Sequence, residues 1–237
     1  MINAALRGDH HVHSTFSDDA VSTLAQNVEA ASAIGLTTLR LVDHVRQSTT
    51  WVPEYLAAVR ALQVPDGLTV LTGVEAKILD VAGTLDIPVL PTGIDRILIA
   101  DHQFPGVEGP LGPSAVRERI AEGWATDDVL DQLIEAIIAT MRRYPGNQLA
   151  HCFSILPKIG LSEGDLGAQR TEAWARAAAD TGTLVEVNEK WGCPGVATLA
   201  TLRRAGGDIV ASTDSHDASE VGRYSRIIPL LDAVEAS

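Results

Sequence analysis

The chain has only two cysteines, no long apolar run and fewer bases than acids. Cys152 and Cys193 lie far apart and form no C-x-x-C pair, which is typical of reduced thiols in the cytosol. Because no stretch of about 18 consecutive apolar residues occurs, no transmembrane helix and no membrane partner are expected. The first residues also lack the apolar core of a secretory signal. These absences predict a cytoplasmic protein.

The shortage of bases limits which ligands the surface can hold. The 237 residues include 18 Lys or Arg against 31 Asp or Glu, a formal net charge of −13 at pH 7. Binding a long polyanion by counterion release needs many basic contacts, so no long nucleic acid is expected as a partner. A small anionic substrate is compatible with this charge, because bound divalent metal ions reverse the local field even in an acidic protein.

Short strand-like segments alternate with longer helix-like segments, and hydrophobic residues make up 46% of the chain. A chain of this length suits one full-size α/β barrel or two small domains. With no repeat, low-complexity segment or clear linker, we expect a single domain over residues 1–237. Strands are predicted in the opening segment and at residues 37–42, 68–75, 97–102, 148–151, 184–188 and 209–214. Helices are predicted at 22–35 with Ser22 as N-cap, from Pro53, at 114–122 with Ser114 as N-cap, at 126–143, 171–180 and 194–205, and after Asp217. Residues 104–113 are predicted to be a Gly/Pro-rich loop.

The seven histidines follow a pattern. His11 and His13 form an H-x-H pair near the N-terminus, and residues at i and i+2 of a strand point to the same face. The adjacent His10 points to the opposite face, so packing or exposure is expected for it. The remaining histidines each follow a predicted strand directly: His44, His102, His151 and His216. This placement indicates one shared site, and imidazoles with carboxylates suit Zn, Mn or Fe.

The polar residues at the strand ends also decide between two α/β architectures. Every predicted strand ends in a side chain that could bind metal: His11 and His13, His44, Glu75, His102, His151, Glu186 with Asn188, and Asp214 with His216. A doubly wound open sheet concentrates its site at one switch point, whereas a closed barrel builds it from many strand ends. Seven contributing strands therefore favour a parallel (β/α) barrel.

These motifs resemble the PHP (polymerase and histidinol phosphatase) family of metal-dependent phosphoesterases. The string D-x-H-V-H-S-x-x-S-D begins at Asp9, and D-H, G-x-E, single histidines and a final D-x-H ending at His216 follow in the family's order. The resemblance implies a distorted (β/α)7 barrel with the active site at the C-terminal ends of the strands. It also implies three divalent metal ions there.

The resemblance assigns nine ligands to the three metal ions. His11, His13, Glu75 and Asp214 would hold the first ion, and Glu75 would bridge to a second ion held by His102 and His151. The third ion would be held by His44, His216 and a residue of the loop after H-x-H. Asp18 matches the Asp of the S-D-G sequence in some members and is preferred. This chain reads S-D-D, so Asp19 is the alternative.

The implied chemistry is hydrolysis by a hydroxide that bridges two metal ions, formed near neutral pH because the ions lower the pKa of bound water. The residues expected at the reacting centre are Asp214, Glu75 and His216. Four bases after strand ends are expected to bind the substrate anion: Arg46, Lys77, Lys190 and Arg223. Lys158 is placed similarly, and Trp191 could form a pocket floor. Asp9, Asp43, Asp101, Asp217, Glu186 and Asn188 are candidates to orient the ligands or the substrate.

The sequence therefore predicts a trinuclear hydrolase that cleaves a small phosphomonoester, either histidinol-phosphate-like or a sugar or metabolite phosphate. The alternatives are a phosphodiesterase or an amidohydrolase on the same metal site, or a metal-binding PHP module without turnover. Degenerate modules would be expected to lose ligands, whereas all nine positions are filled here if Asp18 or Asp19 serves. The sequence does not indicate an oligomeric state.

Overall fold

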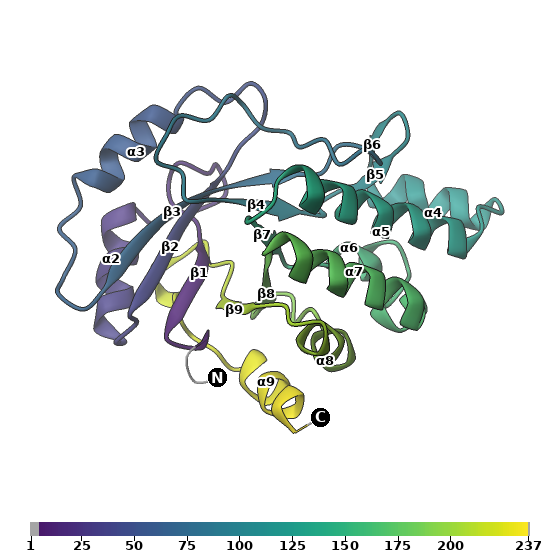
Figure 1. Cartoon of the computed structure of the whole chain (residues 1–237). Coiled ribbons are helices and arrows are strands. Elements are labelled where there is room, and N and C mark those ends of the chain that lie inside the picture. Colours follow the sequence, from purple (N-terminus) through teal and green to yellow (C-terminus); the bar gives the residue numbers. More distant parts are fainter. Residues whose placement is uncertain (1–4, 237) are drawn as a thin grey trace.

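A twisted, nearly closed parallel sheet forms the centre of the protein (Figure 1). The structure is a computed structural model that describes residues 5–236. Seven strands follow one another in chain order around the sheet: β1 (Gly8–Val12), β2 (Thr38–His44), β3 (Thr69–Lys77), β4 (Arg96–Ala100), β7 (Gln148–Ala150), β8 (Leu184–Asn188) and β9 (Ile209–Ser212). A parallel bridge between Val12 and Ser215 brings the first strand next to the segment after the last. The predicted seven-stranded barrel is confirmed.

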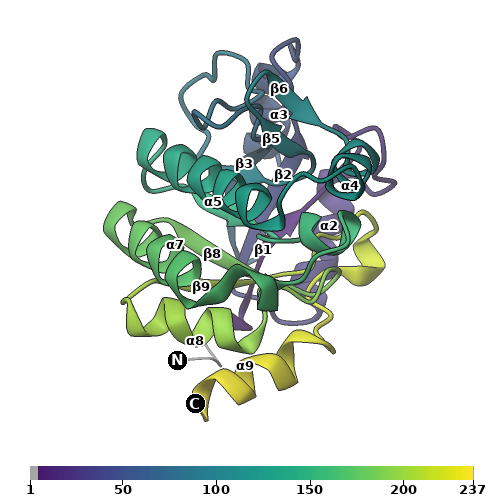
Figure 2. The same cartoon turned by 90° about the vertical axis from the view of Figure 1, so that its right-hand side faces the viewer.

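Helices cover the outside of this sheet, and α5, α7, α8 and α9 lie side by side along one flank (Figures 1 and 2). Their bounds are α2 (Leu24–Ala33), α3 (Val52–Arg60), α4 (Pro113–Ala121), α5 (Thr126–Arg143), α6 (Ile155–Lys158), α7 (Gly167–Thr181), α8 (Val196–Arg204) and α9 (Ile227–Glu235). Two 3-10 turns, η1 (Glu163–Leu166) and η2 (Ala218–Glu220), complete the set. In α5 the buried residues Val129, Leu133, Ile137 and Met141 recur every four positions, as the sequence predicts.

None of the helices in the described part is long and apolar enough to cross a membrane.

Several predicted boundaries are wrong because local hydrogen bonding decides them. The N-cap of α2 is Thr23, whose hydroxyl forms a capping box with Gln26, whereas the Ser22 hydroxyl accepts the Ala218 N–H. Ser114 does not cap α4, because Pro113 already occupies its first turn. Residues 104–113 contain a hairpin of β5 (Phe104–Gly106) and β6 (Gly109–Leu111) instead of a plain loop.

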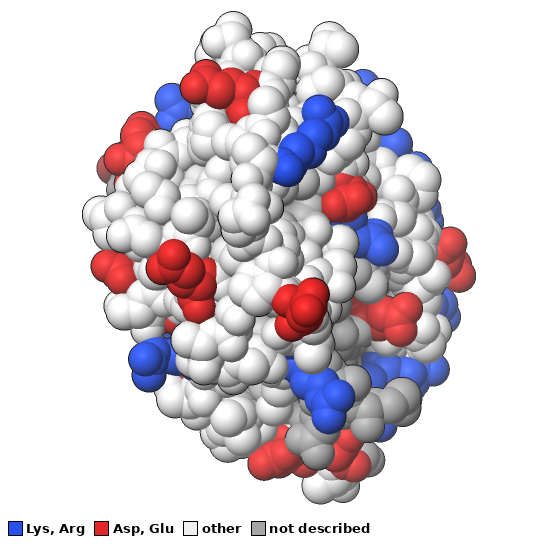
Figure 3. Space-filling model, turned by 90° about the vertical axis from the view of Figure 1, so that its left-hand side faces the viewer, with Lys and Arg blue, Asp and Glu red and all other residues white. Residues whose placement is uncertain are grey.

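Charged side chains are scattered over the face that carries α2 and α3 (Figure 3). Acids and bases are interspersed there among a larger uncharged area. A long polyanion needs a continuous basic surface, which this face does not present. The prediction against long nucleic acid stays a prediction.

The seam between β1 and β9 is held by side chains as well as by backbone. Asp9 is fully buried, and its carboxylate accepts the backbone N–H groups of Thr213 (3.0 Å) and Gly222 (2.8 Å) as well as the Thr213 hydroxyl. Burial raises the pKa of Asp9 to about 6, against the opposing effect of these hydrogen bonds. The Tyr224 hydroxyl donates to the Gly8 carbonyl at 2.6 Å. Asp9 therefore closes the barrel next to the H-x-H pair.

A small group of apolar side chains lies inside the barrel just below the mouth. Val42, Leu98, Ala100 and Ala150 form a small core of their own, separate from the core between sheet and helices. Val42 lies two residues before His44 on β2 and so shares its face, and Leu98 pairs in register with Glu75. This apolar plug lies beneath the polar residues at the strand ends.

The burial of His10 leads to a prediction about the stability of the folded protein at low pH. His10 lies away from the other histidines, at a cavity of about 370 Å³ lined also by Arg203 and Leu231. Burial, with the nearby Arg40 charge, lowers its pKa to about 4. The unfolded chain therefore binds an additional proton between pH 6.5 and 4, and acidification over that window should lower the free energy of unfolding by about 2 kcal/mol through this group.

Urea unfolding of the metal-free protein between pH 7 and pH 4 tests this. The His10→Gln variant should lose less stability over that range than the wild-type protein. Equal losses in the two proteins would show that His10 titrates normally in the folded state.

Candidate metal centre

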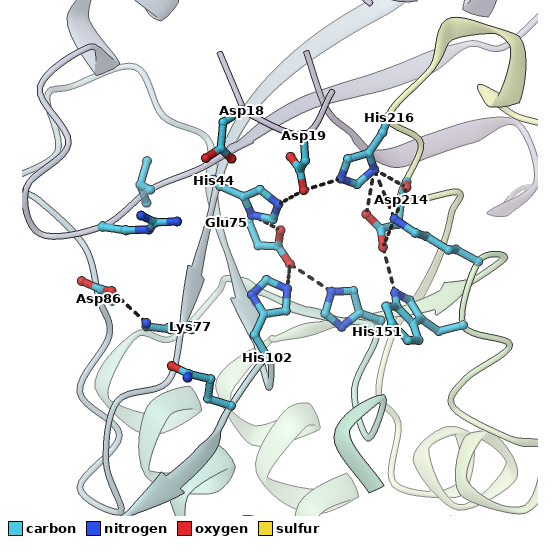
Figure 4. Close-up of a pocket in the computed structure, with 15 residues that line it drawn as sticks. Asp18, Asp19, His44, Glu75, Lys77, Asp86, His102, His151, Asp214 and His216 are labelled. Carbon is cyan, nitrogen blue, oxygen red and sulfur yellow. Dashed lines mark hydrogen bonds and ion pairs between the residues drawn. The ribbon is translucent and has the colours of Figure 1, made fainter. Parts of the chain in front are cut away.

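Side chains from six of the seven strand ends meet at one mouth of the barrel: His11 and His13 from the end of β1, and one residue from each of five further strands. His44 ends β2, Glu75 lies in β3, and His102, His151 and Asp214 follow β4, β7 and β9. Figure 4 shows them, with Asp19 and His216, around one pocket of about 430 Å³. The carboxyl ends of parallel strands all open at the same end of the barrel, which is why residues far apart in the sequence converge here.

Glu75 is the centre of this arrangement. Its carboxylate is buried, and Oε1 lies 3.1 Å from His102 Nε2 and 3.0 Å from His151 Nε2. Oε2 lies 2.9 Å from His44 Nδ1 and within 3.5 Å of the Nε2 atoms of His11 and His13. Burial alone would raise the pKa of Glu75, but the surrounding imidazoles outweigh it and hold the pKa well below its usual range. A carboxylate with both oxygens directed at imidazoles suits a bridging metal ligand.

Four donor atoms form the first group. His11 Nε2 and His13 Nε2 lie 2.9 Å apart, and Asp214 Oδ1 lies 3.8 Å and 3.3 Å from them. Glu75 Oε2 lies 3.4 Å and 3.5 Å from the same two nitrogens. Donors bound at 2.0–2.1 Å around a tetrahedral zinc ion are about 3.3 Å apart. The four atoms therefore fit one four-coordinate divalent ion.

The hydrogen bonds behind His11 and His13 direct both Nε2 lone pairs to the same point. His11 Nδ1 faces the Glu186 carboxylate at 3.1 Å. His13 Nδ1 faces Ser17 Oγ at 3.3 Å, and that hydroxyl donates its single hydrogen to Asp43 Oδ1 at 2.7 Å. The hydroxyl therefore accepts the His13 Nδ1–H. Two lone pairs only 2.9 Å apart require a positive charge between them, either a proton or a metal ion.

In the protein alone, protons supply that charge. Burial lowers the pKa of His11, but the carboxylates of Glu186 and Glu75 outweigh it and raise the pKa well above its usual value. His151 behaves in the same way, and the carboxylates of Asp101 and Glu75 raise its pKa to about 10. Metal ligands must be deprotonated, so ions binding here would displace these protons.

The second group consists of Glu75 Oε1, His102 Nε2 and His151 Nε2. A serine and a carboxylate lie behind its His151, as they do behind His13. His151 Nδ1 faces Ser154 Oγ at 3.1 Å, and that hydroxyl donates to Asp101 Oδ1 at 2.9 Å. The order carboxylate, hydroxyl, imidazole is the same as in Asp43, Ser17 and His13. Asp43 and Asp101 are thus linked to His13 and His151 through serines, which the spacing of the sequence motifs does not reveal.

The backbone is strained where two of these ligands lie. His151 has φ 28° and Asp214 has φ 55°, in the left-handed region that non-glycine residues rarely adopt. Such conformations cost about 1–3 kcal/mol each and persist where function requires the resulting side-chain direction. The His151 N–H is held by Glu186, which fixes this turn.

In the third group the contacts with His44 and His216 come from Asp19, the alternative named from the sequence, and not from the preferred Asp18. Asp19 Oδ2 lies 3.4 Å from His44 Nε2 and 3.2 Å from His216 Nε2. Burial alone would raise the pKa of Asp19, but the two histidines outweigh it and lower the pKa. Asp18 also lines the pocket, but within residues 5–236 it forms no ion pair with a histidine. The S-D-D sequence could not decide this, because the fold of the turn determines which carboxylate points inward.

The predicted substrate-binding bases divide into two sets. Arg46, Lys77 and Lys190 line the pocket, with Lys77 3.5 Å from Asp86 and Lys190 3.5 Å from Asp214 Oδ2. Arg223 does not line it, because its guanidinium donates to the Ser219 carbonyl at the turn η2.

The remaining candidates have supporting positions. Glu186 is buried and accepts hydrogen bonds from the side chains of Gln148 and Asn188 as well as from His11. Asp217 caps η2. Trp191 donates its indole N–H to Asp214 Oδ2 at 2.9 Å, a contact that no sequence signal indicates.

Comparisons with known proteins agree with this geometry. A model of the PHP domain family matches residues 9–190. A probable phosphatase of Acetivibrio thermocellus is 26% identical over 96% of this chain and 86% of its own, and a probable phosphatase of Enterobacter sp. is 28% identical over 95% and 85%. A histidinol phosphate phosphatase of Lactococcus lactis, solved with zinc, L-histidinol and phosphate, superposes with a TM-score of 0.66. It covers 97% of this chain and 92% of its own at 16% identity, which shows a shared fold.

The two serines provide a test of the ligand geometry. Ser17→Ala and Ser154→Ala should each weaken binding at one ion by about 10–100-fold, because His13 or His151 loses the partner that fixes its tautomer. Competition with a chromophoric chelator measures this. Ser14→Ala is the matched control, because the Ser14 hydroxyl donates to Asp43 at 2.7 Å but contacts no imidazole. Wild-type affinity in all three variants would contradict the assigned relays.

Proposed function

Because the chain belongs to the PHP family, we propose that it is a metal-dependent phosphatase that hydrolyses a small phosphomonoester. The observation that carries the proposal is the convergence of five histidine nitrogens on Glu75, in a pocket lined by Arg46, Lys77 and Lys190. The names of the relatives support a phosphatase, and the zinc, histidinol and phosphate of the Lactococcus lactis enzyme support a small phosphorylated substrate.

Three divalent ions, Zn, Mn and/or Fe, would be held by nine residues. The first ion would take His11, His13, Glu75 and Asp214; the second Glu75, His102 and His151; the third His44, His216 and Asp19. Bound divalent ions activate water near neutral pH and neutralise phosphoryl oxygens. The donor set of imidazoles and carboxylates without thiolate suits all three metals.

The chain's own bases would bind and orient the phosphoryl group. Lys190 Nζ lies 3.3 Å from His216 Nδ1 and 3.5 Å from Asp214 Oδ2, at the edge of the centre. Lys77 lies across the pocket from Asp214 (Figure 4), and Arg46 also lines the pocket. Cations on both sides of a phosphate compensate the charge that develops during hydrolysis. Asp214, Glu75 and His216 lie between them and would adjoin the reacting atoms.

The complete donor groups favour an enzyme over a binding module without turnover. A degenerate module is expected to lack ligands, whereas each of the three groups here has at least three donors within contact distance. A phosphodiester or an amide is an alternative substrate on the same centre, and the assay below separates these cases.

Metal content by plasma mass spectrometry, together with hydrolysis of p-nitrophenyl phosphate by the same preparation, tests the proposal. About three transition-metal ions per chain with turnover are expected. His11→Ala combined with His13→Ala should abolish metal retention and activity while circular dichroism changes little. Protein that binds no metal after reconstitution would contradict the proposal, and metal without monoester turnover would favour a diester or amide substrate.

A pair of adjacent aspartates tests the third group. Asp19→Asn should lose about one ion per chain and reduce kcat/KM on the order of 100-fold, since an amide is a poor metal ligand. Asp18→Asn is the matched control and should keep three ions, because its carboxylate forms no ion pair with His44 or His216. The reverse result would restore Asp18 as the ligand.

A further inference from the structure

A second cavity adjoins the pocket of the metal centre. Its volume is about 700 Å³, and the two share the side chains of Lys190 and Trp191. Its walls come from the segment around α6, from η1 and from the loop after β8, and they include Pro157, Val196 and Phe153. Apart from Lys190 and Trp191, the residues that line the pocket of the metal centre do not line this second cavity. We call the second cavity the tryptophan cavity.

Trp191 forms a fixed wall between the two spaces. Its indole N–H donates to Asp214 Oδ2 at 2.9 Å, and its backbone N–H donates to Asn188 Oδ1 at 2.9 Å. Its ring centroid lies 5.9 Å from that of His151. Trp191 is nevertheless 38% exposed. One edge of Trp191 thus contacts the metal centre while the rest of the ring lines the cavity.

The tryptophan cavity is cationic in a protein that is acidic overall. Lys158 Nζ lies 4.0 Å from the centroid of the Trp191 ring, and Lys190 and Arg226 also line the space. The acid in the lining, Glu163, already accepts the Gly195 N–H at 2.9 Å and the Thr198 hydroxyl at 2.6 Å. Among the ion pairs of residues 5–236, none joins Lys158 to a carboxylate. The ammonium of Lys158 is thus held over an aromatic face and available to an anion.

We propose that this cavity receives the leaving group of the phosphomonoester, and that the leaving group of the preferred substrate carries a second negative charge. The inference rests on the proposed function. With the phosphoryl group at the metal centre, the rest of the substrate would extend past Lys190 over Trp191 toward Lys158. Hydrolysis breaks the P–O bond; water adds its oxygen to phosphorus and leaves a proton on the departing alcohol. The second anion takes no part and serves recognition only.

With this charge preference, the substrate would differ from phosphate esters whose leaving group carries an amine. L-histidinol, bound by the Lactococcus lactis enzyme, carries an amine. Lys158, Lys190 and Arg226 would repel such a group, whereas a carboxylate or a second phosphate would be attracted. The apolar residues Pro157 and Val196 would contact the uncharged body of the leaving group.

Three aryl phosphates whose para substituent is anionic, neutral or cationic test the inference on the metal-loaded protein. They are 4-(carboxymethyl)phenyl, 4-(hydroxymethyl)phenyl and 4-(aminomethyl)phenyl phosphate, in which a methylene keeps the phenol leaving groups comparable. KM should be about tenfold lower for the carboxylate than for the neutral ester, and highest for the amine. A bisphosphate analogue distinguishes a preference for phosphate from one for carboxylate.

Variants of Lys158 make the test specific. Lys158→Met should raise KM for the carboxylate about tenfold with little effect on kcat or on the neutral ester, and Lys158→Glu should reverse the order of carboxylate and amine. Lys77→Met is the matched control, since Lys77 lies in the phosphate pocket outside the tryptophan cavity and should change all three KM values alike. Equal KM values in wild type, or equal effects of Lys158→Met on all three esters, would overturn the inference.

If none of the esters is hydrolysed, the proposed function fails and the cavity is tested by binding alone. Calorimetric titration with 4-hydroxyphenylacetate and with 4-(aminomethyl)phenol should then show binding of the acid only, weakened by Lys158→Met. Absence of that preference would overturn the inference independently of any phosphatase activity.

Discussion

The structure depends on one buried carboxylate surrounded by imidazoles. Glu75 lies in the middle of the barrel mouth, and five histidines from four other strands direct nitrogens at its two oxygens. An isolated buried charge would destabilise the fold by several kcal/mol, so it persists only with compensating positive charge around it. Ser17, Ser154 and Glu186 fix the direction of three of these histidines, His13, His151 and His11. Protons or metal ions must therefore occupy the mouth.

Much of this could be predicted from the sequence, for a definite physical reason. Parallel strands in a barrel bring all their carboxyl ends to one mouth, so a histidine directly after each strand is enough to locate the site. Strand ends alone were enough to predict four histidines of the site: His44, His102, His151 and His216. Glu75 could be predicted in the same way, because it ends a recognisable strand segment.

The residues whose direction could not be predicted lie in loops. A loop has no helical or strand period from which the direction of a side chain could be predicted. Asp18 and Asp19 are equivalent in sequence, and only the turn places Asp19 between His44 and His216. Arg223 follows the last strand as Lys190 follows β8, yet its guanidinium is bound by the turn η2. Ser17 and Ser154 act through hydrogen bonds between distant segments. Such contacts exist only once the tertiary structure has formed.

The seam between β1 and β9 links the metal centre to the order in which the chain is made. His11 and His13 leave a ribosome about two hundred residues before Asp214 of the same donor group. Until Asp214 emerges, a nascent chain therefore holds only part of this donor group. Completion of the donor group and closure of the barrel depend on the same segment, the one that carries β9 and the residues after it.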